Sequence, residues 1–392
     1  MDKRVLSEIK DKIKTPCYVF DTDIFTRRAG QVRQAFGENV SLCYSIKANP
    51  FLTGLCEGCF DNLEVCSPGE LRICQSVGVA PEKIIFSGVN KSYEDIENAF
   101  NYGVKLFTAE SRRHLELINE VSGANNTVTD VILRLAHGSQ FGIDVSELRE
   151  LIKCRADFAN VHIIGLHYFT GTQKTKPSKI EKELASLDEL LCELKESFGF
   201  EPAHIEYGTG LGVEYYKDFT DETELALLDE ASVFVRAFAE KYPFTVEMGR
   251  FFAASCGFYM TSAADIKSTD GINYVICDGG INQLNYYGQN MAMKIPPIET
   301  LDDKKGEITD YCLCGSLCTT ADVLIRKVSL PRLEIGDTLV FSKCGAYSMC
   351  EGLSIFLSRS LPAVAAYSET NGIKPLRGHT ETFTLNFGGE SI

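Results

Sequence analysis

The 392-residue sequence lacks any run of 18 apolar residues, which excludes an ordinary membrane-spanning helix. It also lacks an excess of basic residues, since 39 Lys and Arg against 54 Asp and Glu give a formal net charge of −15. This charge is spread along the chain and disfavours nucleic acid or an anionic membrane as the main partner. The opening MDKRVLSEIKDKIK carries charges where a signal peptide has its apolar core, so we expect a cytoplasmic protein.

The sequence lacks the regular spacing of a disulfide framework, although it contains 15 cysteines. We therefore expect reduced and mostly buried thiols. Cys56 and Cys59 in CEGC have the spacing of a metal or redox pair. No second pair and no nearby histidine completes a zinc site, so we predict that no metal is bound.

The order of the predicted elements indicates the fold. After Thr15-Pro16, short strand-like runs alternate with longer helical patterns, as in a parallel sheet covered by helices. Eight such runs favour an α/β fold with a (β/α)8 TIM barrel over a doubly wound sheet. The runs cover 40–48, 62–67, 83–88, 105–110, 128–136, 161–169, 204–210 and 244–249.

From about residue 258 the pattern changes to strand-like runs separated by turns, which predicts an all-β C-terminal domain. We therefore divide the chain into three parts. Residues 1–26 form an N-terminal segment that joins the β domain, 27–257 form the barrel, and 258–392 form the β domain.

Polar or glycine-rich residues stand where most of the predicted barrel strands end. In a TIM barrel these strand ends share one face, where active sites are built. Residues that are distant in sequence should therefore converge there. They are Lys47, Glu64, Glu70, Arg134, 169–173, 208–212 and 247–250.

Lys47 follows apolar residues at the end of the first predicted strand, SLCYSIKANP. Burial lowers the pKa of an amine and suits it to form an imine with an aldehyde, while the glycines of GTGLG (208–212) would admit a phosphate to backbone N–H groups. Pyridoxal phosphate supplies both the aldehyde and the phosphate. The alternatives are an ordinary solvated lysine and an ordinary cluster of turn glycines.

Glu247 and Arg250 in VEMGR lie on the same predicted rim. An acid there could pair with the pyridine nitrogen of the cofactor, and a guanidinium with its phosphate or with a carboxylate. A surface ion pair is the alternative.

Ten motifs occur in the order typical of one family. The whole chain resembles the pyridoxal-phosphate-dependent decarboxylases of the alanine-racemase-like fold, the group that holds diaminopimelate and ornithine decarboxylases. The motifs are YSIKANP, EVCSPGEL, IIFSGVNKS, SQFGID, GLHYFTGTQ, EYGTGLG, VEMGRFF, CDGGIN, CGSLCTTADVL and CGAYS.

The resemblance implies a role for each matching residue. Lys47 would bind the cofactor covalently, Glu247 would meet its ring nitrogen, and Phe169 would cover its ring. Cys318 would come from the partner subunit of a homodimer with shared active sites, and would help to protonate the product carbon after carbon dioxide leaves. The implied phosphate ligands are Gly208, Thr209, Gly210, Gly249, Arg250 and Tyr347, and the implied substrate contacts are Arg250, Cys318, Thr319 and Tyr347.

The chain departs from its better-known relatives at three places. Phe169 stands where a histidine usually stacks on the cofactor, and Thr319 stands where an acid usually meets the distal ammonium of the substrate. After DGGIN, residues 285–287 replace an arginine that binds a distal carboxylate. The resemblance is therefore closer to a biosynthetic-cluster branch, some of whose members decarboxylate amino acids tethered to a carrier protein.

Two other functions fit the same fold. An amino-acid racemase or epimerase uses the same fold and cofactor. For a racemase of this fold, the resemblance implies an arginine at the ring nitrogen of the cofactor instead of an acid. Glu247 favours decarboxylation, because a carboxylate keeps the ring nitrogen protonated and lets the ring accept electrons. The other alternative is a non-catalytic homologue that binds pyridoxal phosphate, and the joint presence of the site residues disfavours it.

Overall fold

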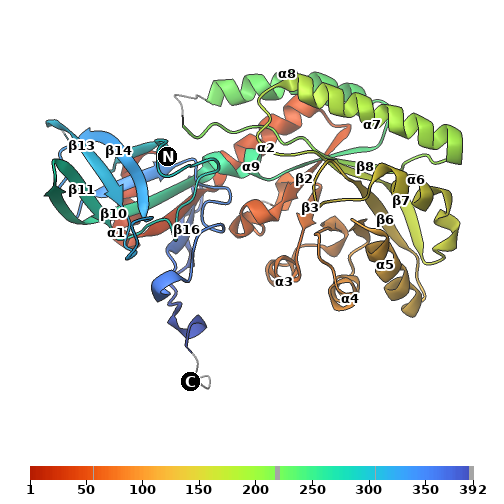
Figure 1. The fold of residues 1–392 in the computed structure, drawn as a ribbon, viewed down its shortest axis with the longest axis horizontal. Coiled ribbons are helices and arrows are strands. Elements are labelled where there is room, and N and C mark those ends of the chain that lie inside the picture. Colours follow the sequence, from red (N-terminus) through yellow and green to blue (C-terminus); the bar gives the residue numbers. More distant parts are fainter. Residues whose placement is uncertain (56, 217–220, 305, 388–392) are drawn as a thin grey trace. The chain divides into compact units, whose positions relative to one another are not determined.

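The computed structural model describes residues 1–55, 57–216, 221–304 and 306–387. These residues form two compact units (Figure 1). The barrel unit contains residues 26–213 and 221–252, and the sheet unit contains residues 1–25, 214–216 and 253–387. The boundaries that we predict from the sequence, at 26 and 257, stay a prediction.

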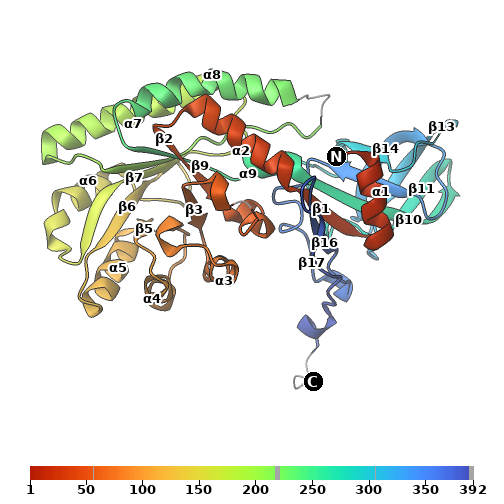
Figure 2. The same ribbon diagram turned by 180° about the vertical axis from the view of Figure 1, so that it is seen from behind.

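Strands β2 to β9 close into a parallel barrel in chain order, which confirms the predicted (β/α)8 TIM barrel (Figure 1, Figure 2). The strands are β2 (Val40–Ser45), β3 (Asn62–Val65), β4 (Ile84–Phe86), β5 (Leu106–Ala109), β6 (Thr129–Leu135), β7 (Val161–Phe169), β8 (His204–Gly208) and β9 (Phe244–Met248). The helices are α2 (Thr22–Phe36), α3 (Pro68–Val77), α4 (Tyr93–Tyr102), α5 (Arg112–Ala124), α6 (Val145–Lys153), α7 (Pro177–Phe198), α8 (Asp221–Ala239) and α9 (Arg250–Ala253).

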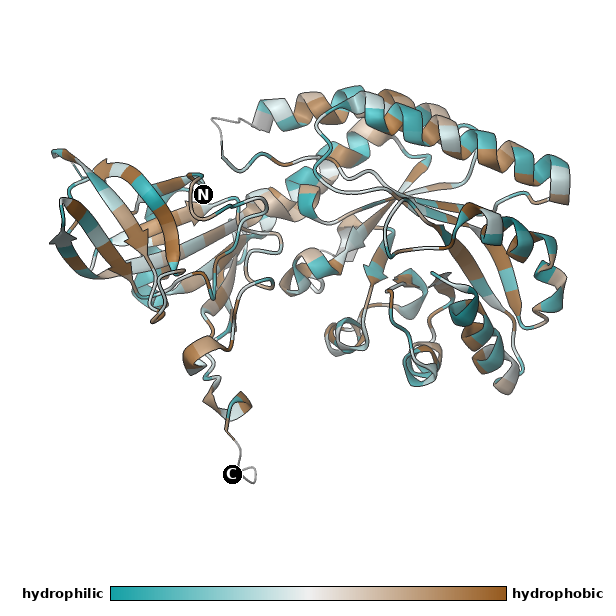
Figure 3. Cartoon of the chain, in the orientation of Figure 1, coloured by the Kyte–Doolittle hydropathy of each residue, from teal (hydrophilic) through white to brown (hydrophobic). Residues whose placement is uncertain are grey.

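The barrel strands have both faces covered, so they read as nearly continuous apolar runs. Every residue of β9 is buried, as is every residue of β2 except Ser41. Helix α7 instead buries a stripe at a spacing of three and four residues, as expected for a helix that packs on a sheet. In Figure 3 the long helices of this unit alternate hydrophobic and hydrophilic segments along their length.

The turn from β3 into α3 is fixed by capping. Ser67 Oγ accepts a hydrogen bond from Glu70 N at 3.1 Å, and Glu70 Oε2 accepts one from Cys66 N at 2.7 Å. Pro68 occupies the first helical position, where its missing N–H costs nothing. These bonds hold Cys66 directly after the strand that carries Glu64.

The sheet unit is built on a mostly antiparallel sheet that includes the N-terminal strand. Its path among the described residues is β14-β13-β11-β10-β1-β16-β17, and β15 pairs with both β10 and β12. The elements are α1 (Lys3–Lys12), β1 (Cys17–Asp21), β10 (Gly257–Thr269), β11 (Ile272–Cys277), β12 (Ile298–Thr300), β13 (Ile308–Cys314), β14 (Val323–Pro331), β15 (Thr338–Ser342), β16 (Ala363–Ser368) and β17 (Gly372–Arg377). This confirms the predicted β domain after the barrel.

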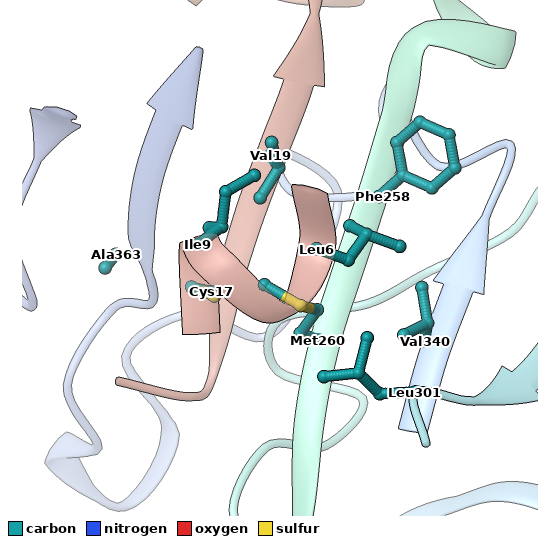
Figure 4. Packing of buried hydrophobic residues seen from close by; sticks show 9 residues of the cluster. All are labelled: Leu6, Ile9, Cys17, Val19, Phe258, Met260, Leu301, Val340 and Ala363. Atoms are coloured by element: carbon teal, nitrogen blue, oxygen red, sulfur yellow. The ribbon is translucent and has the colours of Figure 1, made fainter. Parts of the chain in front are cut away.

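Helix α1 covers one face of this sheet. Leu6 and Ile9 of α1 pack with Val19 of β1 and Met260 of β10 in one fully buried cluster (Figure 4). Strand β1 runs antiparallel to β10 and parallel to β16, so the first residues of the chain are part of the core of the sheet unit.

Short 3₁₀ turns connect several of these elements. The turns η1 (Ile46–Ala48) and η2 (Pro50–Leu52) follow β2, and η6 (Ala254–Cys256) follows α9. The others are η3 (Glu57–Cys59), η4 (Pro81–Lys83), η5 (Arg155–Asp157), η7 (Phe356–Ser358) and η8 (Phe383–Leu385).

Cys66, Cys192 and Cys318 are among the free thiols in the described part of the chain. Cys56 of the predicted pair lies outside the described residues. Among the residues with a described placement, no three His, Cys, Asp or Glu side chains gather as metal ligands. In the same part of the chain, no helix has the length and apolar character needed to cross a membrane.

Candidate active site

Lys47 lies just past the first barrel strand rather than within it. Strand β2 ends at Ser45, and the 3₁₀ turn η1 is closed by a hydrogen bond from Asn49 N to Ile46 O at 3.0 Å. The sequence predicts a strand to residue 48, and this turn shortens it by three residues. The turn places the Lys47 amine 2.6 Å from Glu64 Oε2 and 3.5 Å from Cys66 Sγ, at the carboxyl ends of β2 and β3.

Glu247 on β9 faces the same amine. Its Oε1 lies 3.6 Å from Lys47 Nζ and accepts a hydrogen bond from Ser45 Oγ at 2.5 Å, while its Oε2 lies 3.0 Å from His167 Nε2. Burial alone would raise the pKa of this carboxyl, but the charge of Lys47 and the bond to His167 outweigh burial and hold the pKa well below its usual value. Glu247 is therefore ionised at neutral pH.

Two further carboxyl groups lie in the barrel interior near Glu247. Glu64 is 1% exposed, and its Oε1 accepts a hydrogen bond from the Cys66 thiol at 3.1 Å. Glu206 on β8 is fully buried. Burial first, and then the negative charges of Glu247 and Glu64, raise its pKa well above the usual value. Glu206 is therefore a neutral acid beside an ionised one.

Ser45, His167 and Glu206 are neighbours of the site that were not predicted from the sequence. Their positions follow from register: β7 pairs His167 with Glu206, and β8 pairs Gly208 with Glu247. Alternate residues of a barrel strand face the same side. Glu206 and Gly208 in HIEYG are two residues apart, so Glu206 can be expected to face inward once Gly208 is known to do so.

The loop after β8 requires its glycines. Gly210 has φ +61°, and a Cβ on it would clash with the carbonyl oxygen of Gly171. A Cβ on Gly208 would clash with the ring of Phe169, so this ring lies directly against the first glycine of the loop. Thr209 between them is fully buried. Two of the three residues 208–210 therefore have no side chain that would keep another group away from the backbone.

The loop after β7 holds this glycine loop in place. Lys174 N donates to Gly210 O at 2.8 Å, and Gly212 N donates to Lys174 O at 2.9 Å. Glu183 at the start of α7 fixes the β7 loop, since its carboxylate accepts from Thr170 Oγ1 and from Lys174 Nζ, each at 2.6 Å. Helix α7 therefore positions both loops.

Gly249 and Arg250 follow β9 on the same face. A Cβ on Gly249 would lie 2.8 Å from Ala48 Cβ and 3.1 Å from Ser45 O, so glycine lets this turn approach the turn that carries Lys47. Arg250 is 8% exposed and begins α9. The structure thus gathers Lys47, Glu247, Gly249 and Arg250, and separately brings Phe169 against Gly208.

The remaining predicted residues belong to the sheet unit. Cys318 is exposed and Thr319 is half-buried in the loop that follows β13, and Tyr347 has φ +64° in the loop that follows β15. Their approach to the barrel residues stays a prediction.

Comparison with known proteins agrees with this geometry. Residues 22–254, which include every barrel strand, match the sequence model of the family described as pyridoxal-dependent decarboxylase, pyridoxal binding domain. The chain belongs to this family. It is an enzyme of the ornithine and diaminopimelate decarboxylase group, and its cofactor is pyridoxal phosphate.

Several curated relatives cover nearly the whole chain. The diaminopimelate decarboxylase of Aquifex aeolicus is 26% identical over 362 residues, which are 87% of this chain and 84% of the relative. The L-glutamyl-[BtrI acyl-carrier protein] decarboxylase of Niallia circulans is 28% identical over 92% of this chain and 91% of its own. A solved diaminopimelate decarboxylase of Methanocaldococcus jannaschii, in co-complex with L-lysine, is 27% identical with a TM-score of 0.84 over 95% of this chain and 91% of that chain.

The residues present fit pyridoxal phosphate. Lys47 supplies an amine, and Glu247 supplies a carboxylate that its neighbours keep ionised. Gly208 and Gly210 leave backbone without side chains after β8, and the buried Arg250 after β9 supplies a guanidinium, as a phosphate requires. When bound, pyridoxal phosphate acts as an electron sink.

A Gly210→Ala variant should bind pyridoxal phosphate at least about tenfold more weakly. Alanine at φ +61° costs about 1–3 kcal/mol, and here the methyl group also meets Gly171 O, which pushes the two loops apart. Cofactor titration followed by absorbance measures the effect. Gly199→Ala is the matched control, because Gly199 has φ +60° but open space around its Cβ position, at the end of α7. Equal cofactor affinity in the two variants would show that the loop contact does not matter.

Proposed function

We propose that this decarboxylase acts through Lys47, Glu247 and Cys318 on an amino acid other than diaminopimelate. The observation that carries the proposal is the Lys47–Glu247 pair, in which Lys47 and His167 keep the carboxylate ionised and Ser45 donates a hydrogen bond to it. When bound, the cofactor takes up the electrons that the departing carboxylate leaves behind.

The barrel residues bind and orient the cofactor. Lys47 would hold it covalently, and Glu247 would accept a hydrogen bond from its ring nitrogen and so keep a proton on that atom. Phe169 would cover the ring in place of the usual histidine. The resemblance to the family implies that Gly208, Thr209, Gly210, Gly249, Arg250 and Tyr347 would hold the phosphate.

Cys318 supplies the proton that replaces carbon dioxide. We place its thiol at the active site of the partner subunit in a homodimer, together with Thr319. The exposure of Cys318 supports this role, because a thiol that acts at the active site of the partner subunit has to lie on the surface of the subunit that carries it. Arg250 and Tyr347 complete the substrate contacts.

The proposed substrate differs from diaminopimelate at its distal end. Thr319 carries no charge, so it cannot replace the acid that binds a distal ammonium in the relatives with that substrate. Two curated relatives support a larger substrate. The Niallia circulans relative is named as a decarboxylase of an L-glutamyl group on an acyl-carrier protein. A Staphylococcus aureus relative is named as a 2-[(L-alanin-3-ylcarbamoyl)methyl]-2-hydroxybutanedioate decarboxylase, and it is 26% identical over 93% of this chain and 98% of its own. We infer an amino acid extended at its distal end, such as one linked to a carrier protein.

Release of carbon dioxide from a panel of amino acids tests this proposal. The panel contains diaminopimelate, lysine, ornithine, arginine and a glutamyl thioester, each incubated with the protein and pyridoxal phosphate. We expect the glutamyl thioester to release carbon dioxide fastest. An ordinary enzymatic rate with diaminopimelate would overturn the substrate assignment, and interconversion of stereoisomers without carbon dioxide would indicate a racemase instead.

A Cys318→Ala variant should bind the cofactor normally but turn over slowly or release a wrongly protonated product. The expected loss in turnover is about 10²- to 10⁴-fold, the usual contribution of a positioned proton donor. Turnover in D2O measures the rate, and NMR of a chiral derivative of the deuterated product amine measures the stereochemistry. Cys192→Ala removes another exposed thiol, on α7, and is the control. Normal rate and product in Cys318→Ala would remove this residue from the mechanism.

A further inference from the structure

The loop that carries Cys318 is closed on itself by backbone hydrogen bonds. Gly315 N donates to Asp322 O at 3.0 Å, and Asp322 N donates to Thr319 O at 3.1 Å. The two ends of the segment 315–322 therefore meet, and its apex carries the exposed Cys318. A second loop, 279–283 after β11, lies beside it, because Ser316 N donates to Gly279 O at 2.8 Å.

The Asp322 side chain joins these two loops from the inside. It is 2% exposed, its Oδ2 accepts a hydrogen bond from Leu317 N at 2.7 Å, and its Oδ1 accepts one from Ile281 N at 2.9 Å. One carboxylate thus satisfies a backbone donor in each loop. Such charge-assisted hydrogen bonds are stronger than hydrogen bonds between neutral groups. One of them fixes Leu317, the residue directly before Cys318.

Two glycines make room for this carboxylate. A Cβ on Gly280 would lie 2.7 Å from both Asp322 carboxylate oxygens, and a Cβ on Gly315 would clash with both. The backbone of each loop therefore approaches the carboxylate more closely than any other residue type permits. The glycines of DGGIN and CGSLC, Asp322 and the two N–H donors form one polar unit under the apex.

We propose that Asp322 is the positioning residue for Cys318, and that it fixes the thiol and the neighbouring Thr319 for their action at the active site. The inference rests on the role given to Cys318 under Proposed function. Asp322 touches neither the cofactor nor the substrate in this proposal. It acts by holding Leu317 N, directly before the apex, and Ile281 N in the neighbouring loop, so that the two loops are fixed to each other.

Hydrogen exchange tests the anchoring directly and needs no substrate. In an Asp322→Asn variant the amide oxygen accepts only one of the two N–H donors, while the NH2 group faces the other. We expect the amide of Ile281 or of Leu317 to exchange about tenfold faster than in the wild type. Asp337→Asn is the control, because Asp337 accepts a hydrogen bond from Glu334 N at 2.6 Å in another turn of the same unit. Unchanged exchange at both amides in Asp322→Asn overturns the proposal.

A double-mutant cycle tests whether Asp322 acts through Cys318. Turnover and product stereochemistry are measured in D2O, with whichever panel substrate releases carbon dioxide, for Asp322→Asn, Cys318→Ala and the double variant. We expect Asp322→Asn to lower kcat about tenfold, with unchanged KM and cofactor absorbance, and to give the same wrongly protonated product as Cys318→Ala. The double variant should be no slower than Cys318→Ala alone.

The possible failures are distinct. If Cys318→Ala is slow but Asp322→Asn turns over normally, or if the two losses multiply in the double variant, the role of Asp322 is wrong and that of Cys318 stands. If Cys318→Ala turns over normally, the proposed role of Cys318 fails, and with it the catalytic purpose of the anchor. The exchange rates then still decide whether Asp322 holds the loop.

Discussion

A Lys47→Ala variant should release no carbon dioxide from any substrate and should retain no covalently fixed cofactor. The Lys47 amine is the group that the turn η1 presents to Glu64 and Glu247, and alanine offers no nucleophile there. Borohydride treatment, removal of free pyridoxal phosphate and peptide mapping measure the attachment. In the wild type we expect the modification on the peptide that contains residue 47.

Lys91 is the rival amine and provides the control. It is 5% exposed in the loop after β4, and burial lowers its pKa to about 8, which leaves part of it unprotonated near neutral pH. A Lys91→Met variant should keep the modification at residue 47. A modified peptide that contains residue 91 in the wild type, or a Lys47→Ala protein that still binds cofactor covalently, would contradict the assignment of Lys47.

A Lys47→Arg variant separates the amine from its charge. Arginine keeps a positive charge near Glu64 and Glu247 but stays protonated at any assay pH, so it cannot attack an aldehyde. We expect this variant to fold as well as the wild type and to lack the covalent cofactor. If Lys47→Ala loses the folded state and Lys47→Arg keeps it, the unfolding of Lys47→Ala is caused by the missing positive charge beside the buried carboxylates.

The barrel could be predicted from the sequence because its signals are local. Each strand is a short apolar run, and most are followed by polar or glycine residues that mark the carboxyl end. The same pattern located Lys47, Gly208, Gly249 and Arg250, because the common face of a TIM barrel collects these ends. The end of β2 was misplaced by three residues, since apolar Ile46 and Ala48 in SIKA extend the strand pattern into a 3₁₀ turn.

The partners of Glu247 could not be predicted because they depend on register. His167 is 80 residues away and Ser45 is 202 residues away, and a shift of one residue in the strand that carries either one would turn its side chain out of the barrel. Likewise, the neutral state of Glu206 follows from its complete burial next to Glu247, which no pattern in HIEYG reveals.

The sheet unit was harder to predict for a similar reason. Strand β1 pairs with β10 and β16, which lie more than 200 residues further along the chain, so no local pattern announces it. Strand β12 has three residues, too few for a periodicity to appear. Of the residues in the Cys318 loop, the motif identified Cys318 and Thr319, but the anchoring by Asp322 depends on hydrogen bonds to two separate loops, which no motif shows.

A Glu247→Gln variant should lose about two to three orders of magnitude in kcat while it still binds pyridoxal phosphate at Lys47. Glutamine keeps the shape of the side chain but is neutral, so it no longer holds a proton on the ring nitrogen, and the ring accepts electrons poorly. The folded pKa of Glu247 lies below its usual 4.5 because Lys47 and His167 outweigh burial. Its charge therefore stabilises the native state at neutral pH and is lost only as the pH falls through the folded pKa. We expect no titration of Glu247 in the kcat profile between about pH 5 and 9.

Glu206→Gln is the matched control, because it changes a second buried carboxyl on the neighbouring strand β8. The pKa of Glu206 is raised by burial and by the charge of Glu247, so its folded form is protonated where a free carboxyl would be ionised. Glutamine imitates this neutral acid, and we expect kcat and cofactor absorbance close to those of the wild type. A large loss in Glu206→Gln with a small loss in Glu247→Gln would reverse the assignment and make Glu206 the ionised partner of the ring nitrogen. Equal losses in both variants would show that the two carboxyls share one charge, and that neither residue alone determines the electronic state of the cofactor.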